Sequence, residues 1–354
     1  MMKIVSNFNE QTGMVDINFV VNLPEKFRKQ HEDFFSIYEV TDFQPNQLQD
    51  RLLKPKHERT CRFCTKSFPE VTFKKKAHII PELLGKSSFV SDFECDVCNL
   101  LFSTYETDLA SFIGAPRSLS SKKGKNGNPT YKSAYGNLEI RHREDPETGS
   151  KKDLTSSNFE EDIEINLDDK KMTINADRPP YTPLRVFKSL AKIALTLFNE
   201  EEFAEYADLN LMLQQTDEQQ NKLSGNPLCR AMIYVNPGPE FPSPLALMVR
   251  KKKSSETFPT HSMLLYFHNY IYQIFLPFCK QDLWMYDGKT NITLHSAPPM
   301  VDKAFTNKYG LPELHNVELS SAERIKNQKH TIVMSFNNIL KMEGNENDVT
   351  KSEE

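Results

Sequence analysis

Two cysteine pairs, Cys61-Arg62-Phe63-Cys64 and Cys95-Asp96-Val97-Cys98, decide the fold of the segment around them. Each C-x2-C turn brings two thiols together, and two such turns complete the four-sulfur tetrahedron that structural zinc prefers. Residues 65–94 separate the pairs and leave room for a folded insertion. The spacing therefore predicts a zinc site formed by Cys61, Cys64, Cys95 and Cys98.

The other features of the chain favour metal binding by these cysteines over disulfide formation. The first residues, MMKIVSNFNEQTG, lack the basic start and apolar stretch of a secretory signal, and no run of 18 apolar residues occurs. We therefore expect a cytoplasmic protein without a membrane partner, where disulfides are rare. A thioredoxin-like redox pair is disfavoured because neither pair lies in an evident βαβ unit. The remaining cysteines, Cys229 and Cys279, have apolar neighbours and are expected in the core.

The insertion between the pairs carries a second motif. It contains Lys76-Ala77-His78-Ile79-Ile80-Pro81-Glu82-Leu83-Leu84-Gly85, and the second pair continues directly into Asn99. In this order the motifs resemble the HNH endonuclease family, in the branch that reads C-x2-C, H-I-I-P, L-G and C-x2-C-N with a glutamate following. The resemblance covers about Cys61 to Phe112. Spacing alone would equally suit a zinc ribbon that only holds the fold together.

The resemblance implies a ββα-metal fold, in which one strand carries His78, a second strand returns to the second cysteine pair, and a helix starts near Asn99. It also implies that His78 is the general base, that Asn99 binds a catalytic Mg or Mn ion, and that the reaction is phosphodiester hydrolysis. The residues support the helix independently, because apolar side chains recur at helical spacing. These are Leu100, Leu101, Phe102, Tyr105, Leu109, Phe112 and Ile113.

Two acidic residues are further candidates for this site. Glu106 lies about two helical turns after Asn99, so both could face one ion through oxygen atoms, as Mg and Mn prefer; Asp108 is a rival ligand. Asp92 matches the family's middle polar position and is expected to orient His78 by a hydrogen bond. Ala77 departs from the family, where many members place a metal-binding Asp, Glu or His. The ion would then rely on Asn99, Glu106 and water, or the site is weakened.

Each of these residues also has an ordinary interpretation. A single histidine before Ile-Ile-Pro is usually a core or edge-strand residue, Glu106 could lie on a solvated helix face, and Asp92 could be a turn residue. The combination of motifs favours the endonuclease. The alternative is a non-catalytic zinc-ribbon adaptor that binds nucleic acid or a protein partner.

Composition and charge limit the possible fold class and partners of the chain. Its 354 residues, 38% hydrophobic and 26% charged, are typical of a globular α+β protein of more than one domain. The net charge of -4 does not indicate a strongly basic nucleic-acid binder, so only a local basic track is expected. Two candidate tracks are Lys122, Lys123, Lys125 and Lys132 with Tyr131 among them, and the run Arg250 to Lys253. The expected partner is nucleic acid, with DNA favoured, as in restriction or bacterial antiviral effectors.

We predict five parts along the chain. They are an N-terminal strand and helix region at 1–56, the zinc-bound module at 57–120, a basic loop at 121–135, a larger α+β domain at 136–342, and a disordered acidic tail at 343–354. The larger domain has no recognised role, and a second copy or a regulatory partner could bind it.

Local patterns predict the elements of these parts. Val15, Ile17, Phe19 and Val21 alternate as in a strand, Leu138 to Arg143 forms another, and residues 144–158 form an exposed loop. Further predictions are a hairpin around Asp168 to Lys171, a helix from Thr182 and Pro183 to Leu197, a second helix over 200–214, and a sheet from Ala231 onward.

Overall fold

The computed structural model describes residues 3–9, 14–20, 23–44, 54–86, 89–120, 122–123, 127–145, 149–252, 257–286 and 291–336. Its helices and antiparallel sheets confirm the predicted α+β class. No helix in these ranges is long and apolar enough to cross a membrane. Val21, Lys125, Lys253 and the tail at 343–354 lie outside the described residues.

A six-stranded antiparallel sheet forms the centre of the molecule and confirms the sheet predicted after Ala231. Its strands, in spatial order, are β15 (Glu313–Glu318), β11 (Arg230–Val235), β14 (Tyr270–Phe275), β13 (His261–Phe267), β12 (Leu245–Lys251) and β3 (Tyr38–Gln44). The edge strand β3 comes from the N-terminal region and pairs with β12. The sheet is therefore completed by residues on both sides of the cysteine segment.

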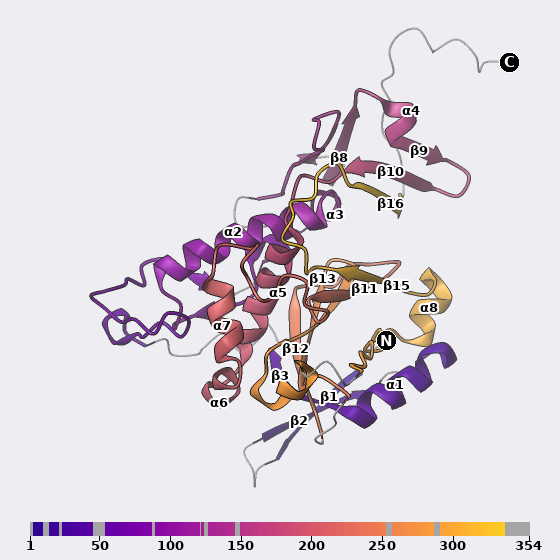
Figure 1. Ribbon diagram of the computed structural model, residues 1–354. Coiled ribbons are helices and arrows are strands. Elements are labelled where there is room, and N and C mark those ends of the chain that lie inside the picture. The colour runs from indigo at the N-terminus through magenta and orange to yellow at the C-terminus, as the bar shows by residue number, and fades with distance from the viewer. Residues whose placement is uncertain are drawn as a thin grey trace, which may run out of the picture.

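Helices cover both faces of this sheet, as Figure 1 shows. Successive strand residues point to opposite faces, so Met248 joins one core and Leu247 the other. The first core includes α5 (Pro183–Leu197) and α2 (Asp96–Ile113), which pack against each other. The second core includes Phe34 of α1 (Glu25–Ile37).

Helix α5 confirms the prediction of a helix up to Leu197, with Thr182 as its N-cap and Pro183 in its first turn. The second predicted helix is wrong as a single element. It divides into α6 (Glu200–Ala204) and α7 (Ala207–Gln214). The backbone of Tyr206 is not helical (φ -113°, ψ 30°), and its fully buried side chain places the hydroxyl 2.8 Å from Nδ1 of His261.

The cysteine segment contains the predicted strand, strand and helix. Strand β4 (Ala77–His78) pairs antiparallel with β5 (Val90–Ser91), and α2 follows. The helix begins at Asp96, earlier than the predicted start near Asn99, because the Cys95 sulfur caps it by accepting from the Cys98 N–H. The first core contains residues from Cys61 to Leu319, so the cysteine segment and the central sheet share it. The domain boundary at about residue 120 stays a prediction.

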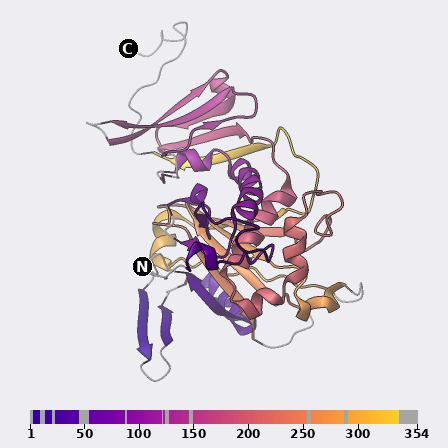
Figure 2. The same cartoon turned by 90° about the vertical axis from the view of Figure 1, so that its left-hand side faces the viewer.

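Two three-stranded sheets lie at one end of the molecule, and the β1–β2 hairpin lies at the opposite end (Figure 2). The first sheet has the order β6 (Tyr131–Lys132), β7 (Leu138–Asp145) and β8 (Gly149–Ser156). The second has the order β16 (Lys329–Ser335), β10 (Lys171–Asp177) and β9 (Ile163–Asn166). Antiparallel pairing of β9 with β10 confirms the predicted hairpin, and β7 confirms the strand predicted at Leu138.

The exposed loop predicted for residues 144–158 is wrong, because β8 occupies most of it and pairs with β7 along its whole length. The sequence of β8, GSKKDLTS, is polar since β8 is an edge strand of its sheet. Leu154 is its apolar contact with the small core formed around Leu138 and Ile140. With a single apolar residue, β8 lacks the alternation of apolar and polar side chains by which a strand is recognised from sequence.

The remaining elements are short or peripheral. They are β1 (Lys3–Asn9), β2 (Met14–Val20), α3 (Pro116–Leu119), α4 (Phe159–Asp162), α8 (Lys303–Tyr309), and the 3-10 turns η1 (Lys56–Glu58), η2 (Glu82–Leu84) and η3 (Lys280–Tyr286). Strand β2 confirms the strand predicted from Val15 to Phe19. Cys229 and Cys279 are fully buried, as expected for core residues.

Candidate functional site

The four predicted cysteines converge on one point. Their sulfur atoms all lie within 4.8 Å of one another, and the Cys64 and Cys95 sulfurs are 3.7 Å apart. A zinc ion with Zn–S bonds of about 2.3 Å would place tetrahedral sulfurs about 3.8 Å apart. The tetrad therefore fits a structural zinc ion. Among the residues that the structure describes, no other group of three or more His, Cys, Asp or Glu side chains lies close enough together to share a metal ion.

The backbone around the tetrad is arranged for thiolates. The Cys95 N–H donates to the Cys61 sulfur at 3.4 Å, and the Cys98 N–H donates to the Cys95 sulfur at 3.5 Å. The neighbouring Cys98 thiol lowers the pKa of Cys61 to about 5 against the opposing effect of burial. A zinc ion needs deprotonated sulfur, so these contacts favour the metal-binding form of Cys61.

Asp96, the first residue of α2, ties the insertion to the start of the helix. Its carboxylate accepts from the Thr72 hydroxyl at 2.5 Å and from the N–H groups of Lys74 and Lys75 at 3.0 and 2.8 Å. These residues lead directly into β4. The strand that carries His78 is thus fixed relative to α2 by a charged, multiply bonded side chain.

His78 lies in β4 opposite Val90 of β5, with its side chain 20% exposed. Its Nε2 atom is 3.5 Å from a carboxylate oxygen of Glu82, a residue of η2. The sequence analysis did not single out Glu82. The adjacent His-x3-Glu spacing is too common to indicate the contact, which depends on the turn at Pro81.

Asn99 and Glu106 both lie on α2 and are partly buried. Seven residues along the helix separate their Cα atoms by roughly 10 Å, and their joint binding of one ion stays a prediction. Burial raises the pKa of Glu106; Lys192 opposes this effect and the Glu94 carboxylate adds to it. The role of Glu106 as a metal ligand stays a prediction.

Two other acidic candidates make contacts elsewhere. Asp92 is buried and accepts from the backbone N–H of Lys54 at 3.3 Å. Its hydrogen bond to His78 stays a prediction. Asp108 accepts from the N–H of Thr182 at 2.6 Å and lies 3.9 Å from Arg185, so it joins α2 to the start of α5. These contacts disfavour Asp108 as the rival metal ligand.

The structure adds a buried ion pair that sequence analysis missed. Lys192 of α5 places its Nζ atom 2.9 Å from Glu94, which directly precedes Cys95. The same Nζ atom donates to the backbone carbonyl of His78 at 3.0 Å. The available signal was a lysine among the apolar residues from Leu190 to Leu195, because a buried lysine needs a partner.

The predicted basic tracks are largely engaged within the protein. Lys122 donates to the carbonyl of Pro242 at 2.9 Å, and Lys132 lies 3.7 Å from Glu139. Tyr131 is buried in the small core, so it is unavailable to stack on a base. In the second run, Lys251 is buried 2.9 Å from Asp282. The described residues of both runs therefore offer less free positive charge than the sequence suggests.

Comparison with known proteins identifies the segment that carries this site. Residues 61–107 match the family model described as HNH endonuclease. The matched residues include the four cysteines, His78, Asn99 and Glu106. No curated protein and no solved structure matches the chain.

Proposed function

Because residues 61–107 belong to the HNH endonuclease family, we propose that this chain is a metal-dependent endonuclease that hydrolyses phosphodiester bonds of nucleic acid, with double-stranded DNA as substrate. His78 is the general base, and a Mg or Mn ion binds at Asn99 and Glu106. One observation supports the proposal above all. His78 is partly exposed, and its strand is held by Asp96 against the helix that begins at the cysteine tetrad.

The chemistry assigned to His78 follows from its surroundings. Its imidazole accepts a proton from water as the water oxygen bonds to phosphorus and the bond to the leaving sugar oxygen breaks. The Glu82 carboxylate, 3.5 Å from Nε2, stabilises the imidazolium that results. Glu82 thereby supplies an orienting carboxylate, a role that the sequence assigned to Asp92.

The donor set around α2 suits a hard divalent cation. Glu82 lies beside His78, and Glu94 pairs with Lys192, whose ammonium also contacts the His78 carbonyl. Carboxylate and amide oxygens are the donors that Mg and Mn prefer. When bound, the ion offsets charge that develops on the phosphate. Glu106 and Asn99 would hold it, since Ala77 offers no ligand atom.

We expect Glu106→Ala to raise the Mg concentration needed for half-maximal cleavage by about tenfold or more, because the ion loses a carboxylate. Asp108→Asn is the matched variant on the same helix. It should lower stability by about 1–2 kcal/mol through its contacts with Thr182 and Arg185, with an unchanged Mg requirement. Mg titrations of cleavage rate measure both. If only Asp108→Asn raised the Mg requirement, Asp108 rather than Glu106 would be the metal ligand.

Cleavage assays on several nucleic acids test the function and its alternative. Zinc-loaded protein is incubated with plasmid DNA, single-stranded DNA and RNA, with Mg, with Mn, or with neither ion. The proposal expects metal-dependent cutting of duplex DNA. Protein that binds nucleic acid or a protein partner but cuts none of these substrates would be the zinc-ribbon adaptor instead.

The parts outside the family match would select the target. We propose that they bind a regulatory partner or a second copy of the chain, and that the protein acts in the cytoplasm as a restriction or antiviral defence effector. This proposal rests on the size of the region outside residues 61–107, which is far larger than the module.

A further inference from the structure

We propose that Lys192 is a positioning residue for His78, so that helix α5, outside the segment that matches the family, sets the geometry of the nuclease site. This inference rests on the proposed function, in which His78 is the general base. Lys192 acts on the backbone that carries His78 and touches neither substrate nor metal. Through this contact, a helix of the C-terminal region is hydrogen-bonded directly to the strand that carries His78.

The ammonium of Lys192 reaches three residues of the cysteine segment. Its side chain is 2% exposed, and its Nζ atom lies 2.9 Å from Glu94 Oε2 and 3.0 Å from the carbonyl oxygen of His78. The ammonium also lies 5.8 Å from the ring of Phe102, on α2. One buried cation therefore contacts β4, the residue before Cys95, and α2, which are the three parts that form the site.

A buried charge of this kind enforces one arrangement of its partners. An ammonium removed from water is tolerated only where other groups replace its hydration. Here the His78 carbonyl accepts a hydrogen bond from it, and the Glu94 carboxylate forms an ion pair with it. Strand β4 has only two residues, so few ladder hydrogen bonds hold it. The bond from Lys192 to the His78 carbonyl adds to the restraint that Asp96 places on the residues before β4.

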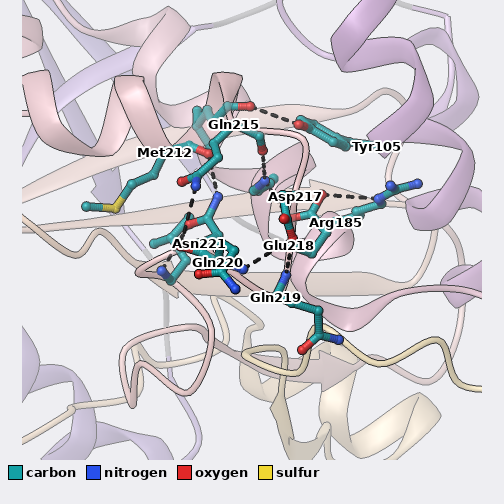
Figure 3. A network of polar contacts seen from close by, with 12 residues as sticks. Tyr105, Arg185, Met212, Gln215, Asp217, Glu218, Gln219, Gln220 and Asn221 are labelled. Carbon is teal, nitrogen blue, oxygen red and sulfur yellow. Dashed lines mark hydrogen bonds and ion pairs between the residues drawn. The ribbon is translucent and has the colours of Figure 1, made fainter.

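Helix α5 also contains a matched lysine without this connection. Lys188, one helical turn earlier, has a fully buried side chain and lies 2.5 Å from Glu218. Its Nζ atom also donates to the carbonyl of Gln215 at 2.6 Å and lies 5.1 Å from the ring of Tyr105 on α2. Figure 3 shows the surroundings of Glu218, with Arg185 directed at it and Tyr105 close by. Lys188 thus shares the burial and ion pairing of Lys192 but does not reach β4.

The test compares Lys192→Met, Lys188→Met and the double variant Glu94→Met/Lys192→Met. Lys192→Met removes the cation that pairs with Glu94, whereas Glu218 in Lys188→Met still pairs with Arg185. Both single variants should lower the unfolding temperature, and Lys192→Met should lower it more. The double variant replaces the whole pair with apolar side chains and should recover much of the loss. The double variant still lacks the lysine that donates to the His78 carbonyl. We therefore expect its kcat to be about 10- to 100-fold below that of the wild type, with little change in KM. Lys188→Met should retain wild-type kcat per folded molecule.

The second readout does not require cleavage. Imidazole NMR signals of the zinc-loaded protein, with His78→Ala for assignment, should move for His78 in Lys192→Met and in the double variant, and stay in place in Lys188→Met. A double variant with wild-type kcat and an unmoved His78 signal would overturn the inference, as would an equal shift in Lys188→Met. If the wild-type protein cut none of the nucleic acids, the proposed function would be wrong. The NMR comparison would still decide whether Lys192 positions His78.

Discussion

Replacing Cys61 with serine should remove the zinc ion and destabilise the protein by on the order of 5 kcal/mol. In small zinc modules, metal binding supplies about 10–16 kcal/mol of folding free energy, and a serine hydroxyl does not replace a thiolate. Cys61 is fully buried and receives the Cys95 N–H. It also belongs to the core that continues into α5 and the central sheet, so the loss should spread beyond residues 61–107.

Zinc content by atomic emission and thermal unfolding by circular dichroism measure this effect. Cys229→Ala is the control, because Cys229 is equally buried in the same core but lies outside the tetrad. It should keep its zinc and lose only about 1 kcal/mol. If Cys61→Ser retained zinc and unfolded at the wild-type temperature, the tetrad would not be a structural metal site.

The parts of the site that could be predicted from sequence are those set by short-range geometry. A C-x2-C turn places its own two sulfurs, and apolar residues at helical spacing after Cys98 produce α2 regardless of the rest of the chain. The fold class followed from such local patterns. The start of α2 was misplaced because its cap is a cysteine sulfur, a less common acceptor than the Ser, Thr, Asp and Asn side chains that usually mark a helix start.

Features that depend on partners distant in sequence could not be predicted. Edge strand β3 meets β12 across some 200 intervening residues, and Lys192 meets Glu94 from a different segment. No local pattern encodes either pairing. The same limit explains Asp108, which looks like a free helix carboxylate in the sequence but is bonded to Thr182. Sequence analysis therefore located the site, whereas its connection to the C-terminal region required the three-dimensional structure.

The second large effect expected is the loss of cleavage in His78→Ala, by about 10²- to 10⁴-fold in kcat/KM. General-base catalysis contributes a factor of this size, and an alanine leaves the attacking water without a proton acceptor. The fold should be unaffected because the imidazole is partly exposed and β4 keeps its backbone bonds, including that from Lys192 to the carbonyl of residue 78. Zinc content and unfolding temperature should therefore equal those of the wild type.

The matched control is His57→Ala. His57 lies in η1 with its side chain 72% exposed, beside Glu58, so it repeats the pairing of a histidine with a nearby carboxylate outside the site. Its removal should leave cleavage unchanged. Equal cleavage rates for wild type and His78→Ala, in protein that retains zinc, would mean that another group activates the water. The contact between His78 and Glu82 would then have no catalytic role.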